Sequence, residues 1–162
     1  MCDVGGIYNP KLLCFDHHQH EYEGPLSSAG MVLLYLREEG ILPEDEYHYL
    51  NDTMIQAVDL DDNGIKGDEL RGVCTFSDVI LQFNPPHYNA KSQECNKYFF
   101  QALDFVVGHL ERKLERYRRQ LAAQEIVKKV MERDTECLYF DQAVPWLENF
   151  FLLGGQQHPA RF

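Results

Sequence analysis

The stretch KLLCFDHHQH, residues 11–20, joins a short apolar run to one carboxylate and three imidazoles. Residues 11–15 have the composition of a short buried strand, and Asp16, His17 and His18 follow them directly. Polar residues at the end of a strand lie at the carboxyl edge of a sheet, where open α/β folds bind ligands. Neutral imidazole together with carboxylate suits ions such as Mn²⁺, Zn²⁺ or Fe²⁺. The stretch therefore predicts a metal site at a sheet edge.

The two adjacent histidines are expected to have different roles. Because successive residues of a strand point to opposite faces of the sheet, His17 and His18 would not easily bind the same ion. The alternative interpretation is a polar loop that carries surface histidines. A second acidic group further along the chain favours the metal site over this alternative.

That second acidic group is DLDDNG, residues 59–64. It follows directly on residues 43–58, whose apolar positions have helical spacing. A run of acids after a helix is also typical of a solvated surface, and this interpretation stays open. Asp3 is a third acidic candidate, which by itself would indicate nothing.

Composition limits the classes of function. The formal net charge of −11 argues against a protein that coats nucleic acid through a basic surface. It leaves metal-dependent phosphate chemistry open, because a cluster of carboxylates is itself a cation site. No apolar run approaches 18 residues, so no membrane-spanning segment is expected. The five cysteines are odd in number and include no C-x-x-C pair, which favours a reducing, cytoplasmic location.

The order of elements can be predicted in outline. Only twelve residues separate Asp3 from Asp16, too few for a helical crossover, so a tight turn or a bend should join the first two strands. A helix capped by Ser27 or Ser28 should end at Gly40, and Pro43 should open the next one. Four further segments complete the expectation: helix or strand at 78–83, a long helix at 94–133, a strand at 137–140 and a strongly apolar segment at 146–153.

Both ends of the sequence indicate a piece of a longer protein. The last 29 residues are too few to bury their own apolar surface, and the candidate chemistry already begins at Asp3. We therefore expect this chain to be the middle of a longer protein. The apolar segment at 146–153 could also bring copies of the chain together as a homo-oligomer.

Six motifs in order resemble one known family. They are DVGGIYNP (3–10), FDHHQ (15–19), LSSAGMVLLYL (26–36), AVDLDDNGI (57–65), QFNPPHY (82–88) and PWLENFF (145–151). This string is similar to the MYG exonuclease family of the DHH phosphoesterase superfamily. The similarity covers nearly the whole chain, and DHHQ, SSAG and DNGI at these spacings are its most specific parts.

The resemblance implies a fold and an activity. The fold class is α/β, with a partial DHH-like parallel-sheet domain at 1–93, a long connecting helix at 94–133 and the start of a second α/β domain at 134–162. The implied activity is hydrolysis of a phosphoester with two divalent cations, commonly Mn²⁺, and a metal-bound water as the nucleophile. The implied substrate is single-stranded RNA or a short oligonucleotide, shortened in the 3′–5′ direction.

The resemblance also implies roles for individual residues. Asp3 would bridge the two metals, His17 would bind metal, and Asp62, or less favourably Asp59, would be a further ligand. His18 would have a catalytic role, contacting phosphate or ordering the attacking water. Asp16 would belong to the same catalytic group, or it would orient a histidine ring by accepting the other ring N–H.

One departure from the family pattern is large. The family's first motif, which reads like HNGxFHxDE and supplies ligands to both metals, is absent. The chain therefore holds about half of such a site. Two alternatives remain open: a hydrolase of a small phosphorylated metabolite, which the acidic composition favours, and a non-catalytic interaction module that uses the long helix as its docking surface.

Overall fold

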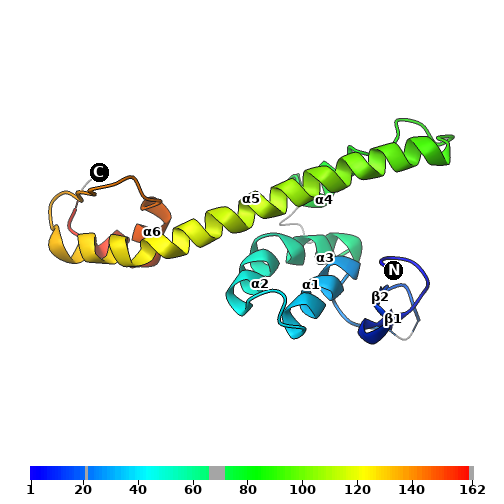
Figure 1. The fold of residues 1–162 in the computed structure, drawn as a ribbon, viewed down its shortest axis with the longest axis horizontal. Helices are drawn as coiled ribbons and strands as arrows, with labels where there is room; N and C mark the ends of the chain where they lie inside the picture. The colour runs from blue at the N-terminus through cyan, green and yellow to red at the C-terminus, as the bar shows by residue number, and fades with distance from the viewer. Residues whose placement is uncertain (21, 66–71, 161–162) are drawn as a thin grey trace. The chain divides into compact units, whose positions relative to one another are not determined.

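A computed structural model describes residues 1–20, 22–65 and 72–160. The chain forms two compact units, Met1–Asp104 and Phe105–Phe162, and the boundary falls inside the long helix α5 (Ser92–Arg133) (Figure 1). The helix begins two residues before the range predicted from the sequence and ends where that range ends. The three domain ranges expected from the resemblance stay a prediction.

The first unit opens with a small sheet. Strand β1 (Tyr8–Asn9) pairs antiparallel with β2 (Cys14–Phe15) across a short 3₁₀ turn, η1 (Pro10–Leu12). Cys2 adds an isolated parallel bridge to Phe15. The mixed α/β class and the tight connection are therefore confirmed. Within the described residues, the parallel pairing is limited to this one bridge.

Three helical segments follow and pack together. Helix α1 (Ser28–Glu38) contacts both α2 (Glu44–Leu50) and α3 (Gln56–Asp62), and a π-helical turn, η2 (Asn51–Ile55), joins the last two (Figure 1). The core of this unit is built from apolar side chains on these elements: Cys14, Phe15, Met31, Leu33, Leu50 and Met54. The two helices predicted over this region are confirmed.

Residues 78–83, for which the sequence allowed either a helix or a strand, lie largely in a helix. Helix α4 (Phe76–Leu81) begins with a capping box, in which the Thr75 hydroxyl accepts the Asp78 N–H and the Asp78 carboxylate accepts the Thr75 N–H. These paired bonds satisfy donors that a helix start otherwise leaves free.

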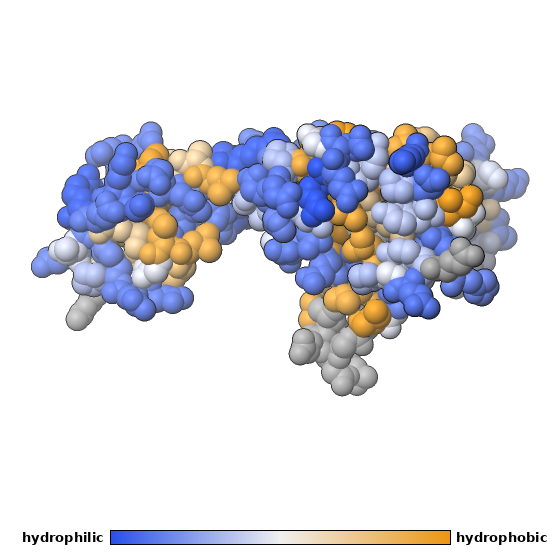
Figure 2. Space-filling model, turned by 90° about the horizontal axis from the view of Figure 1, so that it is seen from below, coloured by the Kyte–Doolittle hydropathy of each residue, from blue (hydrophilic) through white to orange (hydrophobic). Residues whose placement is uncertain are grey.

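The second unit packs the C-terminal half of α5 against α6 (Leu147–Leu152) and a 3₁₀ turn, η4 (Gly155–Gln157). Its buried apolar residues are Ala123, Val127, Val130 and Phe150. The buried amide of Asn149 donates to the carbonyls of Gln120 and Pro145, at 2.8 and 2.9 Å, and so ties α6 to α5. Several apolar side chains of this unit remain exposed, among them Leu147, Phe151 and Leu152 (Figure 2).

The strand predicted at residues 137–140 is wrong, because this segment has no regular secondary structure. Side chains at the end of α5 occupy the backbone groups that a strand would need. The N–H of Tyr139 donates to Asp134 at 2.9 Å, and its carbonyl accepts from Arg133 at 2.6 Å. Tyr139 therefore has neither group available for a neighbouring strand.

Along the described part of the chain, no helix combines the length and the apolar composition needed to cross a membrane.

Candidate metal centre

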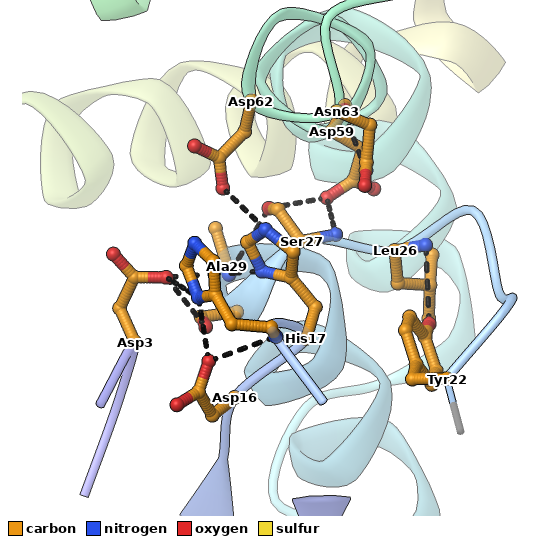
Figure 3. Close-up of polar contacts among 12 residues, drawn as sticks. Asp3, Asp16, His17, Tyr22, Leu26, Ser27, Ala29, Asp59, Asp62 and Asn63 are labelled. Atoms are coloured by element: carbon orange, nitrogen blue, oxygen red, sulfur yellow. Dashed lines mark hydrogen bonds and ion pairs between the residues drawn. The ribbon is translucent and has the colours of Figure 1, made fainter. Parts of the chain in front are cut away.

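Four of the residues singled out in the sequence converge in the first unit. Asp3, Asp16, His17 and His18 each offer one ligand atom, and these atoms all lie within 4.8 Å of one another. Figure 3 labels three of them, Asp3, Asp16 and His17. The backbone explains the convergence. The N–H of Asp3 donates to the carbonyl of Phe15 at 2.9 Å, which holds the start of the chain beside the residues that follow β2.

Asp3 places one carboxylate oxygen near the Nδ1 atom of each imidazole. Its Oδ1 lies 3.7 Å from His17 Nδ1 and 3.8 Å from His18 Nδ1, and it accepts a hydrogen bond of 3.1 Å from the Ser28 hydroxyl. The backbone of Asp3 has a φ of 59°, in the left-handed region that residues other than glycine rarely adopt. Such conformations are concentrated at functional sites.

Asp16 is an anion held by surrounding donors. It is only 2% exposed; its Oδ2 accepts the Gly6 N–H at 2.6 Å, and its Oδ1 accepts the His18 N–H at 3.1 Å. Together with the His18 ring, at 2.7 Å, these donors lower the pKa of Asp16 to about 2. The same contact raises the pKa of His18 above its ordinary value. This is the contact expected of a carboxylate that orients a histidine ring.

His17 carries a polar atom that lacks a partner. Its side chain is 9% exposed, and Nδ1 is buried without a hydrogen bond among the described residues. Its other nitrogen, Nε2, lies 3.7 Å from Oδ2 of Asp62. Because a buried polar atom without a partner is destabilising, this geometry fits a cation held between His17 and the carboxylates. The residues present therefore fit a divalent metal.

The expected separation of the two histidines is wrong. Their rings stack, with centroids 4.2 Å apart and planes inclined by 27°. Strand β2 ends at Phe15, so His17 and His18 do not alternate across a sheet. Both rings consequently face the same cluster.

The two candidate aspartates of α3 lie in different surroundings, although they are only three positions apart in the sequence. Asp62 faces His17 at the edge of the cluster (Figure 3). Asp59 is 5% exposed and accepts two hydrogen bonds from Ser27, at 3.0 Å from its N–H and 2.6 Å from its hydroxyl. The structure thus brings Asp62 to the four clustered residues and ties Asp59 to the start of α1. Their roles as ligands stay predictions.

The SSAG segment, residues 27–30, does more than cap α1, which was not predicted from its sequence. Ser27 caps α1 by accepting the Ala29 N–H, and Ser28 donates to Asp3. Gly30 leaves room for Asp59, since a Cβ at this position would lie 2.5 Å from both carboxylate oxygens. A glycine inside a helix, where it is normally unfavourable, was the available signal of a close approach.

The chain matches a family model over residues 1–160, and the family is described as "Uncharacterised protein family (UPF0160)", MYG1_exonuc. The chain belongs to this family. It is 46% identical over all 162 residues to the MYG1 protein of Chlamydia muridarum (strain MoPn / Nigg), and it covers 55% of that relative. It is 24% identical to the MYG1 exonuclease of Rattus norvegicus in an alignment of 194 positions. This alignment covers 98% of this chain and 51% of the relative.

The family resemblance stated from the motifs is therefore confirmed. The chain spans about half the length of the curated relatives it matches. No solved structure matches it.

Proposed function

We propose that this chain carries part of the catalytic centre of a metal-dependent phosphoester hydrolase. The observation that carries the proposal is the cluster of Asp3, Asp16, His17 and His18, with the partnerless Nδ1 of His17 inside it. Carboxylate and imidazole together are ligands that Mn²⁺ and similar ions accept. The names of mammalian relatives, "MYG1 exonuclease", also support a hydrolase that acts on nucleic acid.

The proposed centre would bind two divalent cations, and Mn²⁺ is the expected ion. Asp3, His17 and Asp62 would be their ligands, and Asp59 is a less favoured ligand. When bound, the cations supply positive charge beside the phosphoryl group under attack. Asp16 accepts the Nδ1–H of His18, which leaves Nε2 as the free nitrogen of that ring. The His18 side chain is 60% exposed, so its ring can reach a phosphate oxygen of a bound substrate.

We infer that the substrate is single-stranded RNA or a short oligonucleotide, shortened in the 3′–5′ direction. The names of the relatives support a nucleic acid. The net charge of −11 favours a second candidate, a small phosphorylated metabolite, because such a substrate needs no extended basic surface. A cytoplasmic location is part of the proposal, supported by five cysteines that are all free.

The test is hydrolysis of 5′-end-labelled single-stranded RNA in the presence of Mn²⁺. The RNA is offered to this chain and to the longest reading frame that contains it, each beside its His17→Ala variant. A ladder of products that shorten stepwise is expected, and His17→Ala should reduce its rate at least ~100-fold, since even residues behind the ligands are worth 10–100-fold. His48→Ala is the matched control, because His48 lies exposed on α2 and pairs with Glu44.

Each outcome decides between the candidates. Hydrolysis of cyclic dinucleotides or mononucleotides, with RNA left intact, would move the proposal to a small phosphorylated substrate. An equal rate for wild type and His17→Ala would reject the cluster as the catalytic centre. A protein that binds no Mn²⁺ would favour the non-catalytic interaction module.

A further inference from the structure

The start of helix α1 joins two carboxylates that are distant in sequence. Ser27 donates to Asp59, 32 residues away, and Ser28 donates to Asp3, 25 residues away. Both serines are buried. Two successive hydroxyls at one helix start therefore link the N-terminal segment, α1 and α3.

We propose that Ser28 is a positioning residue that holds the carboxylate of Asp3 in the metal-binding cluster. The inference rests on the proposed function of that cluster as a metal centre. It assigns to Ser28 a role beyond helix formation.

Asp3 needs such a partner because its surroundings are open. Its side chain is 56% exposed, and an exposed side chain keeps its rotamer freedom unless a contact fixes it. Ser28 is 7% exposed and belongs to a packed helix, so its hydroxyl is a fixed point. It bonds Oδ1, the oxygen that also faces both imidazoles. A carboxylate oxygen can accept more than one contact, so this bond aims Oδ1 and leaves it able to bind an ion.

Ser27 holds α3 in place, as Ser28 holds the carboxylate of Asp3. Its hydroxyl holds Asp59, and Asp62 follows three residues later, on the next turn of the helix. Because one helix start fixes both Asp3 and α3, the separation between Asp3 and Asp62 is fixed as well. The two serines thus set opposite sides of the cluster from one rigid element.

A purely structural role for the Ser28 hydroxyl predicts a different result. The capping bond of α1 comes from Ser27, whose hydroxyl accepts the Ala29 N–H. Ser28 is the first helical residue, and its hydroxyl donates to Asp3, which lies outside the helix. If Ser28 mattered only for the helix, Ser28→Ala would leave metal affinity unchanged.

The experiment measures Mn²⁺ affinity from the electron paramagnetic resonance signal of the free ion. The 162-residue chain is titrated as wild type, Ser28→Ala and Ser28→Thr, with Ser92→Ala as the control. Ser92 is the first residue of α5 and is exposed, so its substitution makes the same chemical change at another helix start. Ser28→Ala should weaken Mn²⁺ binding about 10- to 100-fold. Ser28→Thr, which keeps the hydroxyl, should restore most of the affinity, and Ser92→Ala should match wild type.

A double-mutant cycle separates positioning of Asp3 from a general disturbance. In an Asp3→Asn background, Ser28→Ala should cause little further loss of affinity. An equal further loss in that background, or wild-type affinity in Ser28→Ala itself, would overturn the inference. If circular dichroism shows that Ser28→Ala is unfolded, Ser28→Cys replaces it, because it keeps the side chain's size and is only a weak donor; wild-type affinity in Ser28→Cys would then overturn the inference.

These outcomes are distinguishable from failure of the proposed function, because no substrate is present. Weaker Mn²⁺ binding by Ser28→Ala, together with no RNA hydrolysis by the longest reading frame, would keep the positioning role and reject the substrate. A wild-type chain that binds no Mn²⁺ would reject both.

Discussion

At the scale of single residues, Asp16 and Asp134 show how local donors fix a charge. The pKa of each is lowered to about 2, Asp16 chiefly by the Gly6 N–H and Asp134 chiefly by the Arg133 guanidinium. Both carboxylates are consequently ionised over the whole physiological pH range. Asp16 therefore cannot donate a proton in a reaction near neutral pH. Under the proposed function, its role is to orient the ring of His18.

Asp134 makes stability depend on pH. It receives Arg133 Nε and Nη2 at 2.7 and 2.9 Å and the Tyr139 N–H at 2.9 Å. Because its folded pKa is about 2 in place of the ordinary 3.8, the unfolded chain binds the proton more tightly. The stabilisation is therefore complete above about pH 5 and is lost as the pH falls toward 2. Asp134→Asn should be less stable than wild type at pH 6, and this difference should vanish near pH 2.

The measurement is urea unfolding followed by the fluorescence of Trp146, the single tryptophan, which lies in the same unit. Glu136→Gln removes a nearby exposed carboxylate and is the control. A stability difference for Asp134→Asn that stays constant from pH 6 to pH 2 would contradict this account.

The grouping of Asp16, His17 and His18 could be predicted from their residue types, whereas the geometry of their backbone could not. Asp16, His17 and His18 could be selected because their residue types suit a metal and follow an apolar run. The stacking of His17 on His18 could not be predicted, because it depends on β2 ending at Phe15. The bond from Ser28 to Asp3 joins residues 25 positions apart, so it cannot be predicted from local periodicity.

At the scale of elements, substitution by alanine at two helical glycines should change stability in opposite directions. Gly→Ala in a helix normally stabilises by about 0.5–1 kcal/mol. At Gly108 in α5 the new Cβ would meet the end of the Arg112 side chain at 3.3 Å, which can move away. At Gly30 in α1 it would lie 2.5 Å from the Asp59 carboxylate, which Ser27 holds in place.

We therefore expect Gly108→Ala to stabilise by about 0.5–1 kcal/mol and Gly30→Ala to destabilise by ~1–3 kcal/mol, the usual range for overpacking. Gly30→Ala should also weaken Mn²⁺ binding, because it displaces Asp59 and with it the turn that carries Asp62. Thermal unfolding and Mn²⁺ titration of both variants provide the check. Stabilisation of the chain by Gly30→Ala would show that α3 can move away from α1 at little cost.

The helices could be predicted because their signals are local. Ser27 and Pro43 mark helix starts, and the apolar spacing of 94–133 identifies α5. The strand expected at 137–140 failed because its apolar residues suggest a strand, whereas Arg133 and Asp134 bind the backbone of Tyr139. Side-chain bonds to the backbone are invisible to a hydropathy pattern.

At the scale of the whole molecule, charge is divided unequally between the two units. Residues 1–104 contain 18 of the 26 acidic and six of the 15 basic residues, a net charge of −12, and residues 105–162 carry +1. The cluster lies in the anionic unit. Its carboxylates repel one another, which opposes the compact state, and their negative charge attracts cations. Binding of a divalent cation should therefore stabilise the first unit specifically.

This specificity can be measured by amide hydrogen exchange with mass spectrometry, with and without Mn²⁺. At a free Mn²⁺ concentration of 100 times its dissociation constant, binding stabilises the folded state by about 2.7 kcal/mol. Exchange of the most protected amides of α1 and α3 should slow by up to about 100-fold as a result. Peptides from α6 should exchange at an unchanged rate, and His17→Ala should abolish the effect in α1 and α3. Equal slowing in α6 would show that Mn²⁺ acts on the entire chain through its net charge, whereas slowing confined to α1 and α3 and abolished by His17→Ala would support a site in the first unit that includes His17.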